Sequence, residues 1–189
     1  MFRTRNILPI GMEFNTVEYS FIDMFNDGSI SLIGDNESRI QYIKMLLAML
    51  AKNIVFHNIE AIIIDDKQKN LLHESDFGFV RTYTNDVSEG FAYLTDYFDM
   101  VSERESTEKM NDLSTALLVI NNTELFKQVC ADKNMSKELA SVIRRAKEIN
   151  AYIILGQVEN LPVGFNSSDV LKVLKDERNG LLFAPITDN

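Results

Sequence analysis

Short apolar runs recur along this sequence, and they constrain its fold more than any other feature. Each run is dominated by isoleucine, leucine, valine or alanine and contains no charged residue. The runs lie at residues 30–33, 61–64, 116–120, 152–155 and 181–183. Strands that are buried on both faces of a parallel sheet have this composition. We therefore predict a mostly parallel β-sheet.

Between these runs, apolar residues recur at intervals of three and four, which is typical of helices with one buried face. Asp86 with Glu89 resembles a capping pair, and Ser136 is a candidate N-cap. Strands that alternate with helices indicate an α/β doubly wound domain, with a mostly parallel sheet flanked by helices. The predicted helices lie at residues 40–50, 87–101 and 139–149.

The beginning of the chain has a different pattern. Apolar and polar residues alternate over residues 17–21, and Asn26-Asp27-Gly28 is a strong hairpin signal. We predict an N-terminal antiparallel ribbon that leads into the strand at residues 30–33. Residues 79–84 have the composition of a further short strand.

The composition excludes several classes of function. The formal net charge is -9, whereas sequence-independent binding of DNA or RNA requires basic residues that neutralise phosphates. The single cysteine, Cys130, and two histidines, His57 and His73, have no partners at metal-ligand spacing, so we expect no metal site. No stretch approaches the roughly 18 apolar residues that span a bilayer. We predict one domain that comprises residues 1–189.

The segment after the first apolar run is similar to a phosphate-binding loop. It reads Gly34-Asp35-Asn36-Glu37-Ser38-Arg39-Ile40-Gln41, and a P-loop reads G-x-x-x-x-G-K-[ST]. Gly34 and the four-residue spacer fit this motif. Arg39 replaces the second glycine, Ile40 replaces the lysine that binds phosphate, and Gln41 replaces the hydroxyl that binds Mg²⁺. We interpret the segment as the remnant of a nucleotide site. The alternative is an ordinary strand, turn and helix with an accidental glycine.

A second position has also lost its usual chemistry. A P-loop ATPase needs a carboxylate at the end of a buried strand to orient Mg²⁺ and water, but the run at residues 116–120 ends in Asn121-Asn122. A neutral amide cannot act as a general base. We interpret the two asparagines as the remnant of this acidic site. The alternative is that they are turn residues, as asparagine commonly is.

Asp65-Asp66 follows the run at residues 61–64 and could instead hold a metal ion. Lys67 and Lys69 come directly afterwards. We therefore favour an exposed charged turn, because surface charges are far more common than buried ones.

Two further motifs have both a functional and a structural interpretation. Gln157 ends a predicted central strand, where it could sense a bound phosphate or simply form a turn. Arg144-Arg145 could bind an anion or contact a neighbouring subunit, but such a pair is more often on a solvated helix face.

The order of these pieces resembles FtsK/SpoIIIE-type ATPase domains. It is most like the C-terminal (third) ATPase domain of EssC-type motor proteins, which serve type VII secretion in Gram-positive bacteria. The resemblance implies a RecA-like P-loop NTPase fold. It also implies that residues 1–189 are the C-terminal piece of a longer, membrane-anchored protein, on the cytoplasmic side of the membrane. The matching segments are residues 8–13, 34–38, 62–65, 139–157 and 179–183.

The same resemblance implies partners: other ATPase domains of the same chain, secreted substrates, and further copies in a hexamer. The family uses ATP and Mg²⁺, but Arg39, Ile40, Gln41 and Asn121 depart from its pattern. We therefore expect no cofactor and a pseudo-ATPase that recognises substrates or regulates the motor. We also expect Arg39 to fill the phosphate position and to bond to carbonyls or to carboxylates such as Asp35 or Glu37.

Two alternatives remain open. One is an active ATPase that uses Asp65 or Asp66 for Mg²⁺ and Arg39 for phosphate. The other is a DNA translocase, which the net charge disfavours.

Overall fold

A computed structural model of the chain describes seven segments. They are residues 7–12, 16–23, 27–52, 59–105, 114–156, 168–177 and 180–183. Within them, no helix is long and apolar enough to cross a membrane.

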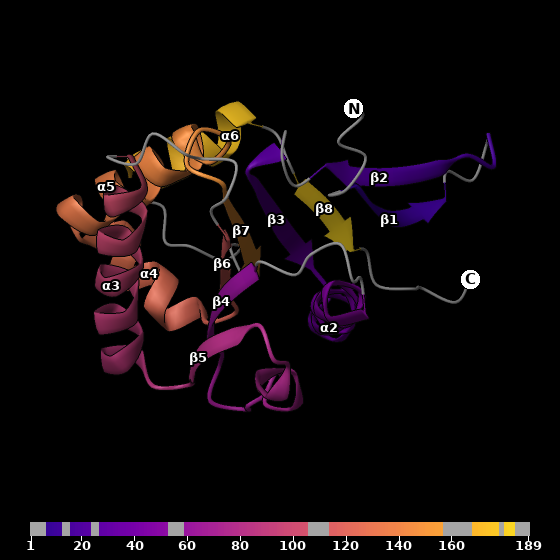
Figure 1. The fold of residues 1–189 in the computed structure, drawn as a ribbon, viewed down its shortest axis with the longest axis horizontal. Helices are drawn as coiled ribbons and strands as arrows, with labels where there is room; N and C mark the ends of the chain where they lie inside the picture. The colour runs from indigo at the N-terminus through magenta and orange to yellow at the C-terminus, as the bar shows by residue number, and fades with distance from the viewer. Residues whose placement is uncertain are drawn as a thin grey trace.

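The described segments form a six-stranded sheet with the order β5-β4-β6-β7-β3-β8, in which every neighbouring pair is parallel (Figure 1). The predicted mostly parallel sheet is therefore confirmed. The run at residues 152–155 forms an inner strand, as predicted, because β7 lies between β6 and β3. The strands are β3 (Ser29–Gly34), β4 (Ile59–Ile64), β5 (Val80–Thr84), β6 (Thr115–Ile120), β7 (Ala151–Gly156) and β8 (Gly180–Phe183).

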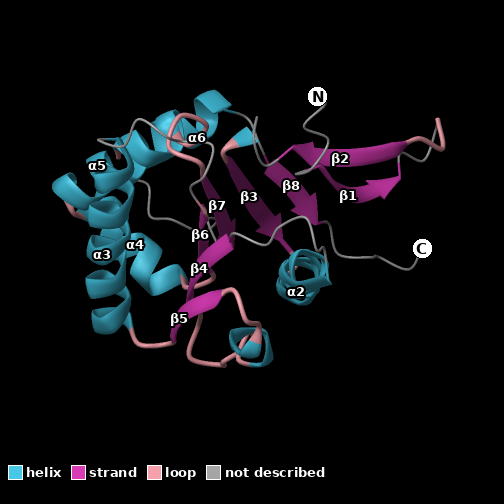
Figure 2. Ribbon diagram, viewed as in Figure 1, coloured by secondary structure: helices cyan, strands magenta, loops and turns pink. Residues whose placement is uncertain are grey.

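Helices cover both faces of the sheet (Figures 1 and 2). α2 (Asn36–Lys52) packs on one face, where its apolar stripe meets Ile30, Leu32 and Tyr152. The other face carries α3 (Val87–Glu105), α4 (Thr123–Ala131), α5 (Lys133–Arg145) and α6 (Asp169–Glu177). A short 3-10 helix, η2 (His73–Asp76), lies between β4 and β5 in the chain. The two apolar layers explain why the central strands read as continuous apolar runs.

The predicted antiparallel ribbon is present, but it does not turn where the sequence indicated. β1 (Ile7–Met12) pairs antiparallel with β2 (Tyr19–Asp23), so the connection lies between Met12 and Tyr19. Asn26 lies outside the described residues, but β2 and β3 do not form the hairpin that the signal at residues 26–28 indicated, because β3 pairs with β7 and β8. Gly28 directly precedes β3 and has a φ of 66°. This is a left-handed backbone conformation, which glycine adopts without a steric penalty.

One predicted helix cap is correct and another is wrong. Asp86 accepts hydrogen bonds from the backbone amides of Ser88 and Glu89 and so caps α3. Ser136 does not cap α5. Asp132 does, through bonds from the amides of Asn134 and Met135, and Ser136 lies inside the helix, where its hydroxyl accepts from the Val170 amide.

Gly34, the last residue of β3, lies beside the edge strand β8 and has a backbone conformation that residues with a side chain rarely adopt. Its φ is 106°, and a Cβ on it would lie 2.0 Å from the carbonyl oxygen of Phe183 in β8. The amide of the next residue, Asp35, donates to that same carbonyl oxygen at 3.0 Å. The end of β3 and the end of β8 therefore meet too closely for a side chain at residue 34.

We predict that Gly34→Ala lowers the free energy of unfolding by about 2 kcal/mol or more, because it adds a left-handed backbone penalty to a steric clash. Gly78→Ala is the matched control, since nothing lies within 4 Å of a Cβ at that exposed glycine. Urea denaturation of both variants measures the difference. Equal stability of the two variants would contradict the predicted crowding at Gly34.

Candidate functional site

Three segments that the sequence analysis discussed converge on one edge of the sheet. Gly34 ends β3, Asp65 follows β4 and Asn121 follows β6. Ile120 in β6 lies opposite Ile64 of β4 and Leu155 of β7. Because parallel strands end at the same edge, all three segments lie at the carboxyl edge, where α/β folds bind ligands.

The P-loop-like segment does not form a loop. β3 ends at Gly34 and α2 already begins at Asn36, so Asp35 is the only residue between strand and helix. Residues 36–41 form the first turns of α2, with Ile40 buried in the core and Gln41 exposed. A P-loop surrounds phosphate with a run of backbone N–H groups outside the helix. This segment contains no such run.

Asp35 occupies the position at the helix N-terminus that favours an anion. Its carboxylate accepts a hydrogen bond from the Ser38 amide at 2.8 Å, and its carbonyl oxygen accepts one from the Arg39 amide at 3.1 Å. The bond from Ser38 lowers the pKa of Asp35, and the nearby charge of Arg39 lowers it further. Free N–H groups and the helix dipole make such a terminus a common phosphate site. Here a carboxylate of the chain itself takes that place.

Arg39 lies inside the protein and points back toward the strand end. Only 2% of its surface is exposed. Its Nη1 donates to the carbonyl oxygen of Gly34 at 3.1 Å, and its Nη2 donates to the Oδ1 of Asn36. The predicted bond to a backbone carbonyl is present. The second hydrogen bond goes to a neutral amide rather than to the carboxylate of Asp35 or Glu37.

Asn121 and Asn122 connect β6 to the end of β4. The Nδ2 of Asn121 donates to Oδ1 of Asp65 at 2.9 Å, and the Nδ2 of Asn122 donates to the Asp65 carbonyl oxygen at 2.8 Å. Asn122 also caps α4, because its Oδ1 accepts from the Leu125 amide. A Cβ on Gly156 would lie 2.8 Å from Oδ1 of Asn121. The amide of Asn121 is therefore packed closely between β4 and β7.

Asp65 is a buried acid, so its interpretation as part of an exposed turn is wrong. Its exposure is 0%. One oxygen accepts from Asn121, and the other accepts from the Leu71 amide at 2.7 Å and from the Tyr83 hydroxyl at 3.1 Å. Burial raises the pKa of Asp65, although the hydrogen bonds from Leu71 and Asn121 act in the opposite direction. Burial, followed by the charge of Asp65, also raises the pKa of Tyr83.

Asp66 is half-buried and shapes a local turn. Its carboxylate accepts from the Gln68 amide at 3.0 Å and from the side-chain amide of Asn70. Lys67 and Lys69 are exposed, as the charged-turn interpretation requires of them. In the described part of the chain, no group of three or more acidic, histidine or cysteine side chains could hold a metal ion.

Arg144 and Arg145 do not join this cluster. Arg144 and Arg145 end α5, which leads into the amino end of β7, so they lie at the opposite edge of the sheet. Arg144 is exposed and Arg145 is half-buried. Gln157 and His57 lie outside the described residues, His73 begins η2, and Cys130 is buried.

One member of the site was not singled out from the sequence. Tyr83, in β5, donates a hydrogen bond to the carboxylate of Asp65. The sequence did contain a signal for the N-cap of α2. Asp35 lies three residues before Ser38, and an Asp at this distance from an amide of the first helical turn is a common N-cap arrangement. Nothing in the sequence pattern links Tyr83 to Asp65, which lies 18 residues away.

No protein-family model matches the sequence, and no curated protein matches it. Solved structures of multi-domain ATPases do match the fold. ATPases 2 and 3 of Thermomonospora curvata EccC, in complex with a signal sequence peptide, match with a TM-score of 0.76 and 15% identity. ATPases 2 and 3 of Geobacillus thermodenitrificans EssC match with a TM-score of 0.72 and 16% identity. These matches cover 97% and 96% of this chain.

A third similar structure is the pCW3 conjugation coupling protein TcpA with ATPγS, at a TM-score of 0.67 and 12% identity, covering 90% of this chain and 53% of that one. Identities this low show the fold alone. The predicted RecA-like P-loop NTPase fold, of the type found in EccC and EssC, is thus confirmed. This chain spans only 35% of the matched EccC chain and 34% of the matched EssC chain.

We predict that Asp65 makes stability depend on pH. Because its folded pKa is raised above the ordinary 3.8, its protonated form favours folding, and this contribution is lost as pH rises through the raised pKa. The free energy of unfolding of the native chain, relative to that of Asp65→Asn, should therefore fall as the pH is raised above about 4. Urea denaturation across this range measures it, and a difference that rises with pH would contradict the burial effect.

Proposed function

We propose that this chain is a non-hydrolysing domain of a type VII secretion motor, a pseudo-ATPase that recognises substrates or regulates the motor. The observation that carries this proposal is the carboxylate of Asp35 at the N-terminus of α2, followed at once by the buried Arg39. The phosphate position of a P-loop fold is filled by side chains of the chain itself.

Binding of ATP would have to displace these contacts. A phosphate at the N-terminus of α2 would meet the negative charge of Asp35 at close range, and Arg39 would have to leave the Gly34 carbonyl to neutralise it. No lysine stands at residue 40 to supply the charge-assisted bonds that are each worth about 1.5–3 kcal/mol. Nucleotide affinity should therefore be weak or absent.

ATP hydrolysis would also lack the carboxylate that orients Mg²⁺ and water in a P-loop ATPase. At the end of β6, Asn121 already donates to Asp65, and an amide cannot accept a proton from water. Asp65 is no replacement, because its two oxygens accept hydrogen bonds from Leu71, Tyr83 and Asn121. Use of Asp65 for Mg²⁺, as an active ATPase would require, means breaking this buried set of bonds.

The similarity in fold to ATPases of secretion systems supports the proposal that this chain is part of a secretion motor. Two of the matched structures are ATPase pairs of EccC and EssC, and the EccC structure contains a signal sequence peptide. We propose by analogy that the complete protein carries other ATPase domains and assembles into a hexamer. Its place would be the cytoplasmic face of a bacterial membrane, where this domain meets secreted substrates.

We predict that titration of the 189-residue chain with Mg-ATP by calorimetry gives no saturable heat, and that no phosphate is released above the buffer rate. The physical reason is the joint loss of the phosphate lysine, the Mg²⁺ hydroxyl and the acid of β6. Calorimetry measures binding, and a phosphate-release assay measures turnover.

Two variants show where any nucleotide binds. Arg39→Met removes the buried guanidinium, and Lys52→Met removes an exposed cation at the far end of the same helix, about 20 Å away. Saturable binding with turnover that Asp65→Ala abolishes would establish the active-ATPase alternative. Saturable binding that Arg39→Met weakens and Lys52→Met does not would show that the remnant still takes nucleotide.

DNA translocation is the second alternative, and the likeness to a conjugation coupling protein is the observation that favours it. The formal net charge of -9 opposes it. Binding of duplex DNA that weakens steeply with salt would support translocation over secretion.

A further inference from the structure

We propose that a cleft between α3 and strands β4 and β5 is a docking site for a basic peptide segment of a partner protein. The segment would present an Arg or Lys side chain next to an apolar residue. The cleft lies toward the amino ends of β4 and β5, away from the carboxyl edge that carries the nucleotide-site remnant. This inference therefore does not rest on the proposed loss of ATP hydrolysis.

The cleft has a volume of 330 Å³ and is formed by one face of α3 against the edge of the sheet. Tyr93, Asp96, Met100 and Glu103 follow one another at intervals of three, four and three residues, so they lie on the same helix face. β4 and β5 contribute the opposite wall. The wall residues are Glu60, Ile62, Arg81 and Thr82.

The floor of the cleft is apolar. Ile62 is buried, and Tyr93 and Met100 are half-buried and pack against the larger core between the sheet and the helices. A cleft of this size accepts one or two large side chains rather than a whole helix. An aliphatic or aromatic anchor, or the methylene stem of Arg or Lys, matches such a floor.

The rim of the cleft is acidic. Glu60, Asp96, Asp99 and Glu103 contribute four carboxylates to the lining, and Arg81 contributes the one guanidinium. Asp96, Asp99 and Glu103 are exposed. Within the described residues, neither Asp96 nor Asp99 forms an ion pair. The charge of the cleft is thus complementary to a cationic occupant, which it would attract and orient.

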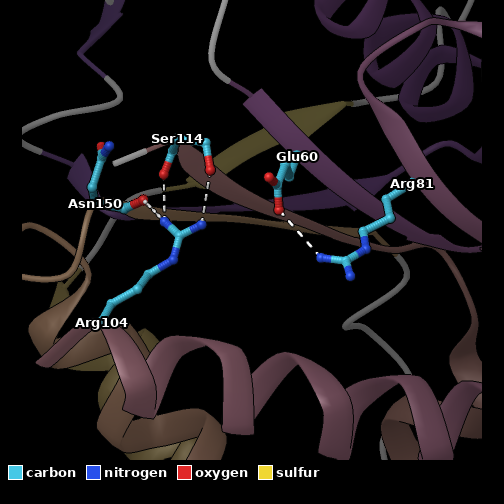
Figure 3. A network of polar contacts seen from close by, with 5 residues as sticks. All are labelled: Glu60, Arg81, Arg104, Ser114 and Asn150. Carbon is cyan, nitrogen blue, oxygen red and sulfur yellow. Dashed lines mark hydrogen bonds and ion pairs between the residues drawn. The ribbon is translucent and has the colours of Figure 1, made fainter. Parts of the chain in front are cut away.

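The ion pair between Arg81 and Glu60 is an example, within the chain, of a guanidinium bound by a carboxylate of the rim. The Nη1 of Arg81 lies 3.4 Å from Oε2 of Glu60, across the neighbouring strands β5 and β4 (Figure 3). Figure 3 also shows Arg104, which rises from α3 and bonds to Ser114 and Asn150 instead. Arg104 is engaged at the start of β6 and is not part of the cleft lining. Asp96 and Asp99 therefore form no ion pair with Arg104 like the one that Glu60 forms with Arg81.

Other occupants fit less well. Nucleic acid would be repelled by the carboxylates. No described group of acidic side chains has the arrangement needed to hold a metal ion. A second copy of the chain would bring together two bodies with a formal net charge of -9 each, which opposes association at low salt. A basic segment of another protein is the occupant that gains from both the charge and the floor.

The test uses a fluorescein-labelled probe peptide, Gly-Arg-Arg-Leu-Arg-Arg-Gly, and fluorescence anisotropy with the 189-residue chain. We predict saturable binding that weakens with salt. The double variant Asp96→Asn with Asp99→Asn should lower the affinity at least fivefold, because it removes two exposed carboxylates from the rim. Replacing the leucine of the probe by glycine should also weaken binding.

The matched control is Asp176→Asn with Glu177→Gln, which makes the same change in net charge at exposed positions of α6. It should leave the affinity within twofold of the native value. Equal weakening by both double variants, or no weakening by the cleft variant, would overturn the proposal. A native chain that dimerises in sedimentation experiments, while the cleft variant stays monomeric, would overturn it in favour of a second copy. Circular dichroism and urea denaturation confirm that each variant folds.

Discussion

The interaction on which the carboxyl edge depends is the contact of Asp35 with the N-terminus of α2. Because that carboxylate accepts from the Ser38 amide, the helix can begin one residue after β3. The early start places Arg39 within the helix, from where it reaches back to the Gly34 carbonyl. The amide of Asp35 bonds in turn to Phe183 of β8. Strand, helix and the neighbouring edge strand are thus joined by hydrogen bonds at this position.

Asp65 likewise joins several elements at the carboxyl edge of the sheet. It collects hydrogen bonds from Leu71, Tyr83 and Asn121, and so ties together β4, β5 and β6. A buried acid costs free energy unless its oxygens are paired. Both oxygens of Asp65 accept hydrogen bonds, whereas Oδ1 of Asn121 is buried and has no hydrogen-bond partner in the described part of the chain. Asn121 therefore serves as a structural donor at the end of β6, and its hydrogen bond to Asp65 helps to offset the cost of burying that acid.

The sequence predicted the elements better than the contacts between them. Apolar runs identified the parallel strands because both sheet faces are covered by helices. The ribbon was predicted, but its turn was misplaced, since the left-handed Gly28 serves the entry to β3 rather than a hairpin. Ser136 was chosen as a cap although Asp132, four residues earlier, binds the helix amides. Asp65 was misread because its burial depends on Tyr83 and Asn121, which lie 18 and 56 residues away.

The carboxylates at the carboxyl edge and those at the cleft beside α3 differ in whether the chain supplies them with hydrogen-bond donors. We interpret the first group as structural and the second as available for recognition. Asp35 and Asp65 are satisfied by donors of the chain, so each stabilises the arrangement it belongs to. Asp96 and Asp99 are exposed above an apolar floor. Carboxylates in that position add little to stability, because solvent screens them, but they impose a charge requirement on whatever covers Tyr93 and Met100. The carboxylates of the carboxyl edge are thus bound by donors of the chain itself, whereas Asp96 and Asp99 beside the α3 cleft stay available to a partner of opposite charge.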